Sequence, residues 1–217
     1  MPQVAHSSEF VTTPVEITEA IPPSLTNGTR KITEWTATVE SVTWSGKTYD
    51  LPWQAVVDTG TYSFNVPRDL ASDINAAFDP PAVYLPDSSD GPVYSVQCNA
   101  TPPAGVGIQL GGKMIRVESR DMIWRDWDGQ CFSTVAPSGS LGDIELFFLG
   151  DYFLRNVVAV FDFGKNEMRW AERYHDSNSS SSGSGPAVVP ATGSATFLES
   201  RWLTISLVCM IAVATWL

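Results

Sequence analysis

Residues 55–61 constrain the fold more than any other part of the chain. They spell Ala-Val-Val-Asp-Thr-Gly-Thr, a short apolar run that ends in an acidic residue and a glycine. Val56 and Val57 favour a buried strand, and Gly60 permits backbone angles or a close approach that a Cβ would block. The pattern therefore predicts a β-strand that presents Asp58 at a strand-to-loop junction, where a carboxylate is a candidate catalytic group.

The segment that follows carries the clearest helical pattern in the sequence. Apolar residues recur at helical spacing over residues 67–78, behind a proline near the first turn. This spacing predicts the one long helix of the chain. It assigns Leu70, Ile74 and Phe78 to the core rather than to a site.

The remaining segments are short and strand-like. Apolar and polar residues alternate over residues 35–42, and a turn at 45–47 leads into a second run, which predicts a hairpin. Runs divided by Pro and Gly clusters follow at 93–98, 107–110, 114–117 and 131–135. This is the pattern of an all-β sandwich or barrel, so the predicted fold class is mostly β.

Residues 55–61 resemble the second active-site motif of the pepsin-like aspartic proteases, family A1, in which two hydrophobic residues precede Asp-Thr-Gly-Thr. The resemblance extends to residues 147–156, which look like the family's Leu-Gly-Asp segment, and to two closing runs at 158–162 and 167–171. Two signatures in order, about ninety residues apart, are more specific than either alone. The resemblance covers about residues 30–173. It implies the C-terminal lobe of the bilobal pepsin-like fold, with one or two short helices, as in fungal secreted or anchored enzymes.

The resemblance also implies a role for each residue of the motif. Aspartic proteases hold two carboxylates, one per lobe, around a water molecule, and Asp58 would supply one of them. Thr59 would brace the loop against its symmetry mate. Gly60 would let backbone groups approach Asp58, and Thr61 would hydrogen-bond the outer carboxylate oxygen. The reaction would be hydrolysis of a protein or peptide substrate at acidic pH, with no metal and no cofactor.

Three more residues take roles from the same resemblance. Leu149 and Gly150 would pack beneath the motif as an apolar-Gly element. Tyr62 stands where the family usually has Ser or Thr, which alters the local hydrogen bonding and the adjoining substrate subsite.

The sequence contains a single Asp-Thr-Gly, although the implied mechanism needs two carboxylates. Residues 1–30 have no basic n-region or apolar h-region of a signal peptide, and we interpret them as part of an inter-lobe segment. We expect residues 31–175 to form the second lobe of an endopeptidase, inactive without its first lobe. Two alternatives stay open: a noncatalytic surface-anchored binding protein, and a homodimer in which two copies of Asp58 meet.

The three cysteines bear on whether the protein is secreted, because disulfides persist in the secretory pathway. Lobes of this family carry a disulfide at the place of Cys98 and Cys131, and closing a loop of about 33 residues would stabilise the fold by roughly 3 to 4 kcal/mol. The alternative is two free buried thiols. Cys209 lies in the apolar tail, and no CxxC or histidine partner suggests zinc.

Three sequons predict N-glycosylation of a secreted protein, and their acceptors are Asn27, Asn99 and Asn178. Beyond the lobe, residues 176–201 form a Ser/Gly/Pro-rich linker, and residues 202–217 form an apolar tail.

This tail has the layout of a glycosylphosphatidylinositol (GPI) signal, with Ala191 and Gly193 as candidate attachment residues. As a helix it would span only about 24 Å, short of the roughly 30 Å hydrocarbon core. We therefore expect an extracellular protein anchored at the plasma membrane or cell wall. A retained tail anchor is the alternative, and release by phosphatidylinositol-specific phospholipase would exclude it.

Charge and aromatic pattern exclude other classes of function. The formal net charge is -11, and none of the 13 Lys and Arg residues cluster, which argues against nucleic-acid binding. One group of acidic and aromatic residues resembles the paired carboxylates and tryptophans of a sugar site, but no second signature supports a glycosidase: Asp121, Trp124, Asp126, Trp127 and Asp128. The sequence around Trp127 is instead typical of a solvated hairpin.

Overall fold

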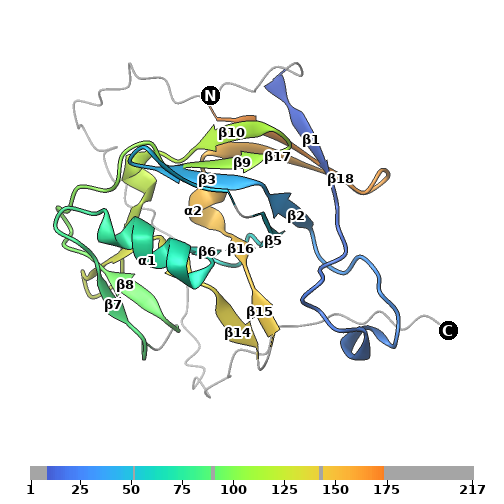
Figure 1. Cartoon of the computed structure of the whole chain (residues 1–217), viewed down its shortest axis with the longest axis horizontal. Coiled ribbons are helices and arrows are strands. Elements are labelled where there is room, and N and C mark those ends of the chain that lie inside the picture. The colour runs from blue at the N-terminus through green and yellow to red at the C-terminus, as the bar shows by residue number, and fades with distance from the viewer. Residues whose placement is uncertain (1–8, 51, 89–90, 142–143, 174–217) are drawn as a thin grey trace, which may run out of the picture. The chain divides into compact units, whose positions relative to one another are not determined.

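The computed structural model describes residues 9–50, 52–88, 91–141 and 144–173 (Figure 1). This part of the chain is mostly β, with two short α-helices, α1 (Arg68–Ala76) and α2 (Asp151–Leu154). Two 3-10 turns also occur there, η2 (Pro23–Thr26) and η3 (Ser119–Asp121). The predicted fold class is confirmed.

A five-stranded sheet lies at the centre of the described residues. Its spatial order is β13 (Val135–Pro137), β6 (Phe64–Val66), β16 (Phe148–Leu149), β5 (Trp53–Val57) and β2 (Thr36–Val39). Two neighbouring pairs, β13 with β6 and β16 with β5, run parallel. Val57, Phe64 and Leu149 are buried in this sheet, so its middle strands form part of the hydrophobic core.

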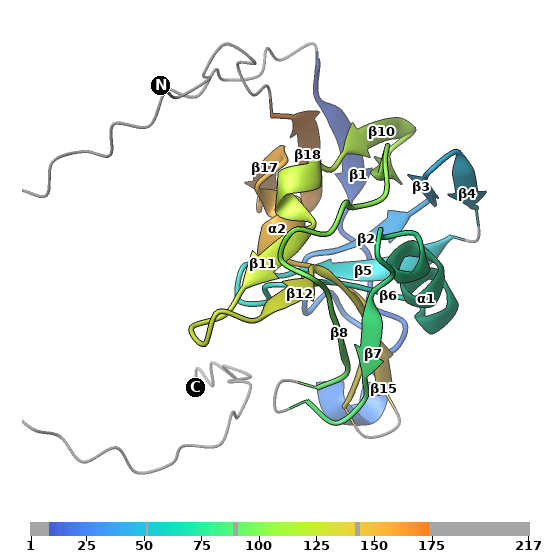
Figure 2. The ribbon, with the colours of Figure 1, turned by 90° about the vertical axis from the view of Figure 1, so that its left-hand side faces the viewer.

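Four smaller sheets complete the described lobe (Figures 1 and 2). One contains β1 (Val11–Pro14), β18 (Glu167–Glu172) and β17 (Val157–Asp162), and a second contains β10 (Lys113–Arg116), β9 (Gly107–Leu110), β3 (Ser41–Trp44) and β4 (Lys47–Tyr49). A third contains β11 (Ile123–Arg125), β12 (Cys131–Ser133), β8 (Val93–Ser95) and β7 (Val83–Leu85), and the last pairs β14 (Gly139–Leu141) with β15 (Ile144–Leu146). The strand runs predicted at 93–98, 107–110 and 114–117 are confirmed as β8, β9 and β10: β8 is shorter, β9 has the predicted bounds and β10 begins and ends one residue earlier. The run at 131–135 is divided between β12 and the start of β13, which belong to different sheets.

The predicted alternation over residues 35–42 does not hold along its whole length. Strands β2 and β3 follow one another with only Glu40 between them, yet they belong to different sheets. Val39, Ser41 and Val42 are all buried, because the inward-facing side changes where the chain passes from one sheet to the next. The predicted hairpin does form, between β3 and β4, and its turn places Ser45 and Gly46 at positive φ.

Helix α1 confirms the helical prediction. Leu70 and Ile74 are fully buried and Phe78, just beyond the helix, is almost so. The Asn75 side chain also holds the helix in place, because its Nδ2 donates hydrogen bonds to the carbonyls of Ala71 and Val135, 2.8 and 2.9 Å away. The second bond ties α1 to β13 of the central sheet.

The ends of the described segment lie side by side. Strand β1 near the start of the described residues pairs with β18 along its length. Trp170 of β18 is fully buried, packs against Phe153, and donates its Nε1–H to Thr13 Oγ1 at 2.9 Å. The buried indole nitrogen thus has a partner, as burial of a polar group requires.

Candidate active site

The turn that carries Asp58 follows directly from strand β5 of the five-stranded sheet. The amide of Asp58 donates to the carbonyl of Leu149 at 3.2 Å, and Leu149 pairs with Val57 in the parallel β16–β5 ladder. Asp58 itself is half-buried, and the next two residues are exposed. The carboxylate is therefore presented at the end of a buried strand, as residues 55–61 predict.

Both oxygens of the Asp58 carboxylate accept hydrogen bonds from its own turn. The backbone N–H of Gly60 donates to Oδ1 at 2.8 Å, and the Thr61 hydroxyl donates to Oδ2 at 2.6 Å. Bonds to an ionised acceptor are the stronger kind of protein hydrogen bond. They fix the direction of the carboxylate and leave each oxygen further lone pairs for a water molecule or another acid.

Gly60 is needed for close approach rather than for unusual backbone angles. Its φ is not among the positive values found in this lobe. A Cβ at this position would lie 3.2 Å from Asp58 Oδ1, which is tighter than nearly all real Cβ contacts. The glycine therefore lets the Asp58 carboxylate fold back onto the Gly60 amide.

Leu149 and Gly150 lie beneath the turn, as the resemblance implies. Leu149 is fully buried, and a Cβ on Gly150 would overlap the backbone carbonyl oxygens of Thr61 and Ser63. Immediately after Gly150, the amide of Asp151 donates to the Thr61 carbonyl at 2.7 Å. The amide of Tyr152 donates to the Tyr62 carbonyl at 3.1 Å. The start of α2 thus supports the turn from below through the backbone.

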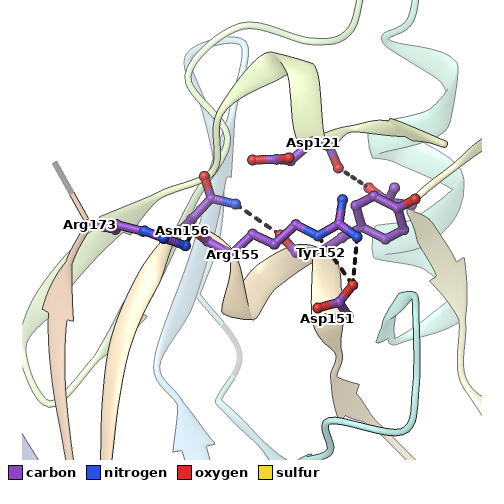
Figure 3. Close-up of polar contacts among 7 residues, drawn as sticks. Asp121, Asp151, Tyr152, Arg155, Asn156 and Arg173 are labelled. Carbon is purple, nitrogen blue, oxygen red and sulfur yellow. Dashed lines mark hydrogen bonds and ion pairs between the residues drawn. The ribbon is translucent and has the colours of Figure 1, made fainter. Parts of the chain in front are cut away.

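Side chains of α2 and of the two residues after it contact one another, and Asn156 also reaches the segment before η3 (Figure 3). Arg155 forms an ion pair with Asp151 at 2.7 Å, and its guanidinium lies 4.3 Å from the centre of the Tyr152 ring. Asn156 Nδ2 donates to the Tyr152 carbonyl at 2.9 Å, and Asn156 Oδ1 accepts from the Glu118 amide. Because both charged side chains are partly exposed, the ion pair adds little stability. The packed Tyr152 ring and the buried Asn156 amide contribute more to holding α2 in place.

One acidic neighbour of Asp58 was missed by the sequence analysis. Strand β2 pairs with β5 in the register Thr36 to Val56, and the Val57 amide donates to the Trp35 carbonyl at 2.8 Å. Extending this register by one more residue places Glu34 opposite Asp58. Atoms packed around the Glu34 carboxyl exclude some water and raise its pKa above the ordinary value, and the negative charge of Asp58 raises it further.

The face around Asp58 is open. Tyr62 exposes 71% of its surface, and Thr59 is exposed with no partner among the described residues that would show the bracing role implied for it. A hollow of about 450 Å³ lies elsewhere, beside the disulfide, and is lined by Arg120, Trp124 and other residues that do not include Asp58.

The other predicted site residues have mixed outcomes. Cys98 and Cys131 form the expected disulfide. Asn27 and Asn99 are exposed, whereas Asn178, Ala191 and Gly193 lie outside the described residues, as do the linker and the apolar tail.

The hairpin around Trp127 is solvated, as its sequence suggests. Trp127 is fully exposed in the turn between β11 and β12, whereas Asp121 is buried near α2. Figure 2 shows this hairpin projecting from the lobe. Asp121 is thus buried while the turn residue Trp127 is exposed, which disfavours a sugar site built from both. Among the helices described, none has the length and apolar character needed to cross a membrane.

Comparison with known proteins gives consistent matches. The family described as eukaryotic aspartyl protease matches residues 21–173. A probable aspartic-type endopeptidase of Aspergillus fumigatus is 43% identical over 123 residues, which cover 54% of this chain and 27% of that protein. Rhizopuspepsin-1 of Rhizopus niveus is 29% identical over 128 residues, which cover 59% of this chain and 30% of the relative.

A solved structure supports the same fold. The crystal structure of the aspartic proteinase from Irpex lacteus superposes with a TM-score of 0.55 at 20% identity. The match covers 81% of this chain and 51% of the Irpex chain. The chain thus spans about half of that structure and less than a third of the two fungal relatives above.

Proposed function

The chain belongs to the eukaryotic aspartyl protease family, and on that premise we propose that it supplies one of the two catalytic carboxylates of an aspartic endopeptidase. The observation that carries this proposal is the Asp58 carboxylate, which accepts hydrogen bonds from Gly60 and Thr61 at the end of a buried strand. A carboxylate fixed in direction and half open to solvent is what activation of a water molecule requires.

The proposed chemistry needs a second carboxylate facing Asp58. Two acids in contact share one proton, because two like charges at that distance cannot both ionise. The ionised acid takes a proton from the water, which attacks the scissile carbonyl of the substrate. The protonated acid polarises that carbonyl and then helps to protonate the leaving amine. The two acids titrate as a pair.

The open face around Asp58 supports a two-lobed enzyme. Thr59, Gly60 and Tyr62 are exposed beside the carboxylate, so a first lobe can approach it and close a substrate cleft. The only Asp-Thr-Gly of this sequence is the one at Asp58, so we assign the second carboxylate to that first lobe. Tyr62, in place of the usual Ser or Thr, would then line the adjoining subsite.

The test compares the chain alone with a two-lobed protein that contains it. Each is incubated with a denatured protein at about pH 3 to 5, with and without pepstatin, beside its Asp58→Asn variant. We expect pepstatin-sensitive cleavage from the two-lobed protein and none from the chain alone. Losing an acid-base partner costs about 10²- to 10⁴-fold, and losing half of the cleft costs more through positioning.

Other outcomes identify the alternatives. Pepstatin-sensitive cleavage by the chain alone that disappears in Asp58→Asn would support a homodimer in which two copies of Asp58 meet. A two-lobed protein that binds peptide but never cleaves it would support a noncatalytic binding protein. Cleavage that survives Asp58→Asn in either protein indicates a contaminating protease.

A further inference from the structure

Glu34 is the acidic side chain nearest in register to Asp58 on the neighbouring strand. The β2–β5 ladder pairs Thr36 with Val56, and the hydrogen bond from the Val57 amide to the Trp35 carbonyl carries the pairing one residue further. The next position on each side is Glu34 and Asp58. Side chains at opposed positions of an antiparallel pair lie on the same face.

The segment that carries Glu34 is held in place by its neighbour. The Trp35 ring packs edge-on against Phe161 and Phe163, with ring centres 5.0 and 4.8 Å away. Its carbonyl is bound to the Val57 amide on the other side. Two aromatic contacts and a ladder hydrogen bond therefore fix the backbone from which Glu34 extends, on the same face of the strand pair as Asp58.

Glu34 carries a charge that the lobe itself does not neutralise. Its side chain is exposed, and the ion pair found within the described part of the chain joins Arg155 to Asp151 instead. The charged neighbour that acts on Glu34 is Asp58, which is also negative. An exposed carboxylate beside a second carboxylate attracts a cation more strongly than either would alone.

We propose that Glu34 is a specificity-determining residue that binds a Lys or Arg side chain of the peptide substrate next to the scissile bond. This inference rests on the proposed function, because it assumes that substrate lies across Asp58. Gly60 and Thr61 orient the Asp58 oxygens toward the position of the catalytic water in the proposed mechanism. Glu34 has no such role there and can bind the substrate. A cationic side chain that reaches Glu34 gains a charge-assisted hydrogen bond.

The experiment uses the two-lobed protein that contains this chain. Paired peptides differ at one residue near the scissile bond, which is Lys in one and norleucine in the other, and each flanking position is tested in turn. The assay runs at the highest pH that still allows turnover, where Glu34 carries most charge. At one position we expect kcat/KM for Lys to exceed that for norleucine by about 2- to 5-fold, the scale of a partly exposed ion pair.

Three variants decide whether Glu34 causes the preference. Glu34→Gln should lower kcat/KM for the Lys peptide about 2- to 5-fold more than for the norleucine peptide, and Glu34→Asp should restore part of the ratio. Glu118→Gln is the matched control, because Glu118 is also exposed and lies outside the Asp58 turn and the strands that carry it. It should leave the ratio unchanged.

The outcomes separate this inference from the function on which it rests. Cleavage of both peptides with no preference for Lys at any position, or a preference that Glu34→Gln leaves intact, overturns the inference and keeps the protease. Cleavage of neither peptide by the unmodified two-lobed protein overturns the proposed function, and the inference with it.

Discussion

At the scale of single residues, the direction of the Asp58 carboxylate depends on two glycines that allow close contact. Gly60 brings its own amide to Asp58 Oδ1, and Gly150 lets α2 reach the carbonyl of Thr61. Neither contact involves a large side chain or a buried area. A methyl group would press on the Asp58 carboxylate at Gly60 and on backbone carbonyls of the turn at Gly150.

Gly150→Ala should therefore destabilise the lobe and disturb the turn. The added Cβ meets the carbonyl oxygens of Thr61 and Ser63, which are backbone atoms and cannot rotate away. We expect a loss of about 1 to 3 kcal/mol in the free energy of unfolding, measured with urea.

Gly164→Ala is the matched control for this substitution. A Cβ there would lie 3.4 Å from Asp162 Oδ1, an ordinary contact, so the change should stay within about 0.5 kcal/mol. Equal stability of the two variants would contradict the packing argument at Gly150.

Glu34 gives a prediction about pH. Exclusion of water is the larger cause that raises the pKa of Glu34, and the charge of Asp58 raises it further. Asp58→Asn removes the second cause, so the Glu34 titration midpoint should move to lower pH yet stay above the ordinary value of 4.5. Carboxyl-carbon NMR titration measures the midpoint directly. An unchanged midpoint would mean that the two carboxylates do not interact.

The raised pKa of Glu34 also determines how this residue changes the stability of the fold with pH. A carboxyl group whose pKa is raised by folding favours the folded state while it is protonated. That contribution is present below the ordinary value and is lost as pH rises through the folded pKa. Glu34→Gln should thus cost no stability at neutral pH.

The sequence predicted Asp58, Gly60 and Thr61 because their contacts are local, within three residues of one another. It missed Glu34 for the opposite reason. Glu34 lies 24 positions before Asp58 in the sequence, and only the register of β2 against β5 brings the two together. A polar residue just before a strand is common, so no local signal distinguished it.

At the scale of elements, the disulfide joins the segment after β8 to the start of β12. Cys98 and Cys131 are 33 residues apart, and between them lie the β9–β10 hairpin, η3 and β11. Strands β12 and β8 share a single register pair, Phe132 with Ser95. The covalent link therefore supplements a short ladder.

Cys98→Ser should destabilise the lobe more than most surface substitutions do. Opening a closed loop of this length costs roughly 3 to 4 kcal/mol in the chain-entropy account. Thermal unfolding followed by circular dichroism measures the loss, with the unreduced and reduced parent protein compared in parallel. If the reduced parent melts at the same temperature as the unreduced one, the disulfide contributes no stability and the prediction is wrong.

Element types were predictable, but their assembly into sheets was not. The helix at 68–76 follows from its spacing of Leu70, Ile74 and Phe78, and the short strands follow from the Pro and Gly clusters between them. Alternation over residues 35–42 failed because it assumes one sheet with one buried face. The parallel pairing of β16 with β5 joins segments about ninety residues apart and has no local signature.

At the scale of the whole molecule, the described lobe has a core of its own and an open face around Asp58. Buried residues from all parts of the described chain, from Val15 to Trp170, form one hydrophobic cluster. Asp58 lies at the edge of that cluster, on a turn whose next residues are exposed. The contacts that orient the Asp58 carboxylate therefore lie within this lobe. The family and the fold could be predicted from this sequence for that reason, whereas a complete substrate cleft between two lobes could not.

The direct passage of the chain from β2 to β3 through the single residue Glu40 has a consequence for how the protein can vary over evolution. Side chains on a strand alternate between faces, so one inserted or deleted residue there would turn every side chain of β3 to the wrong face. Val42 and Trp44 would leave the core, and β2, beside the strand of Asp58, would lose its fixed spacing from β3. Length changes should be confined to surface turns such as the one at Trp127, while the stretch from Thr36 to Trp44 keeps its number of residues.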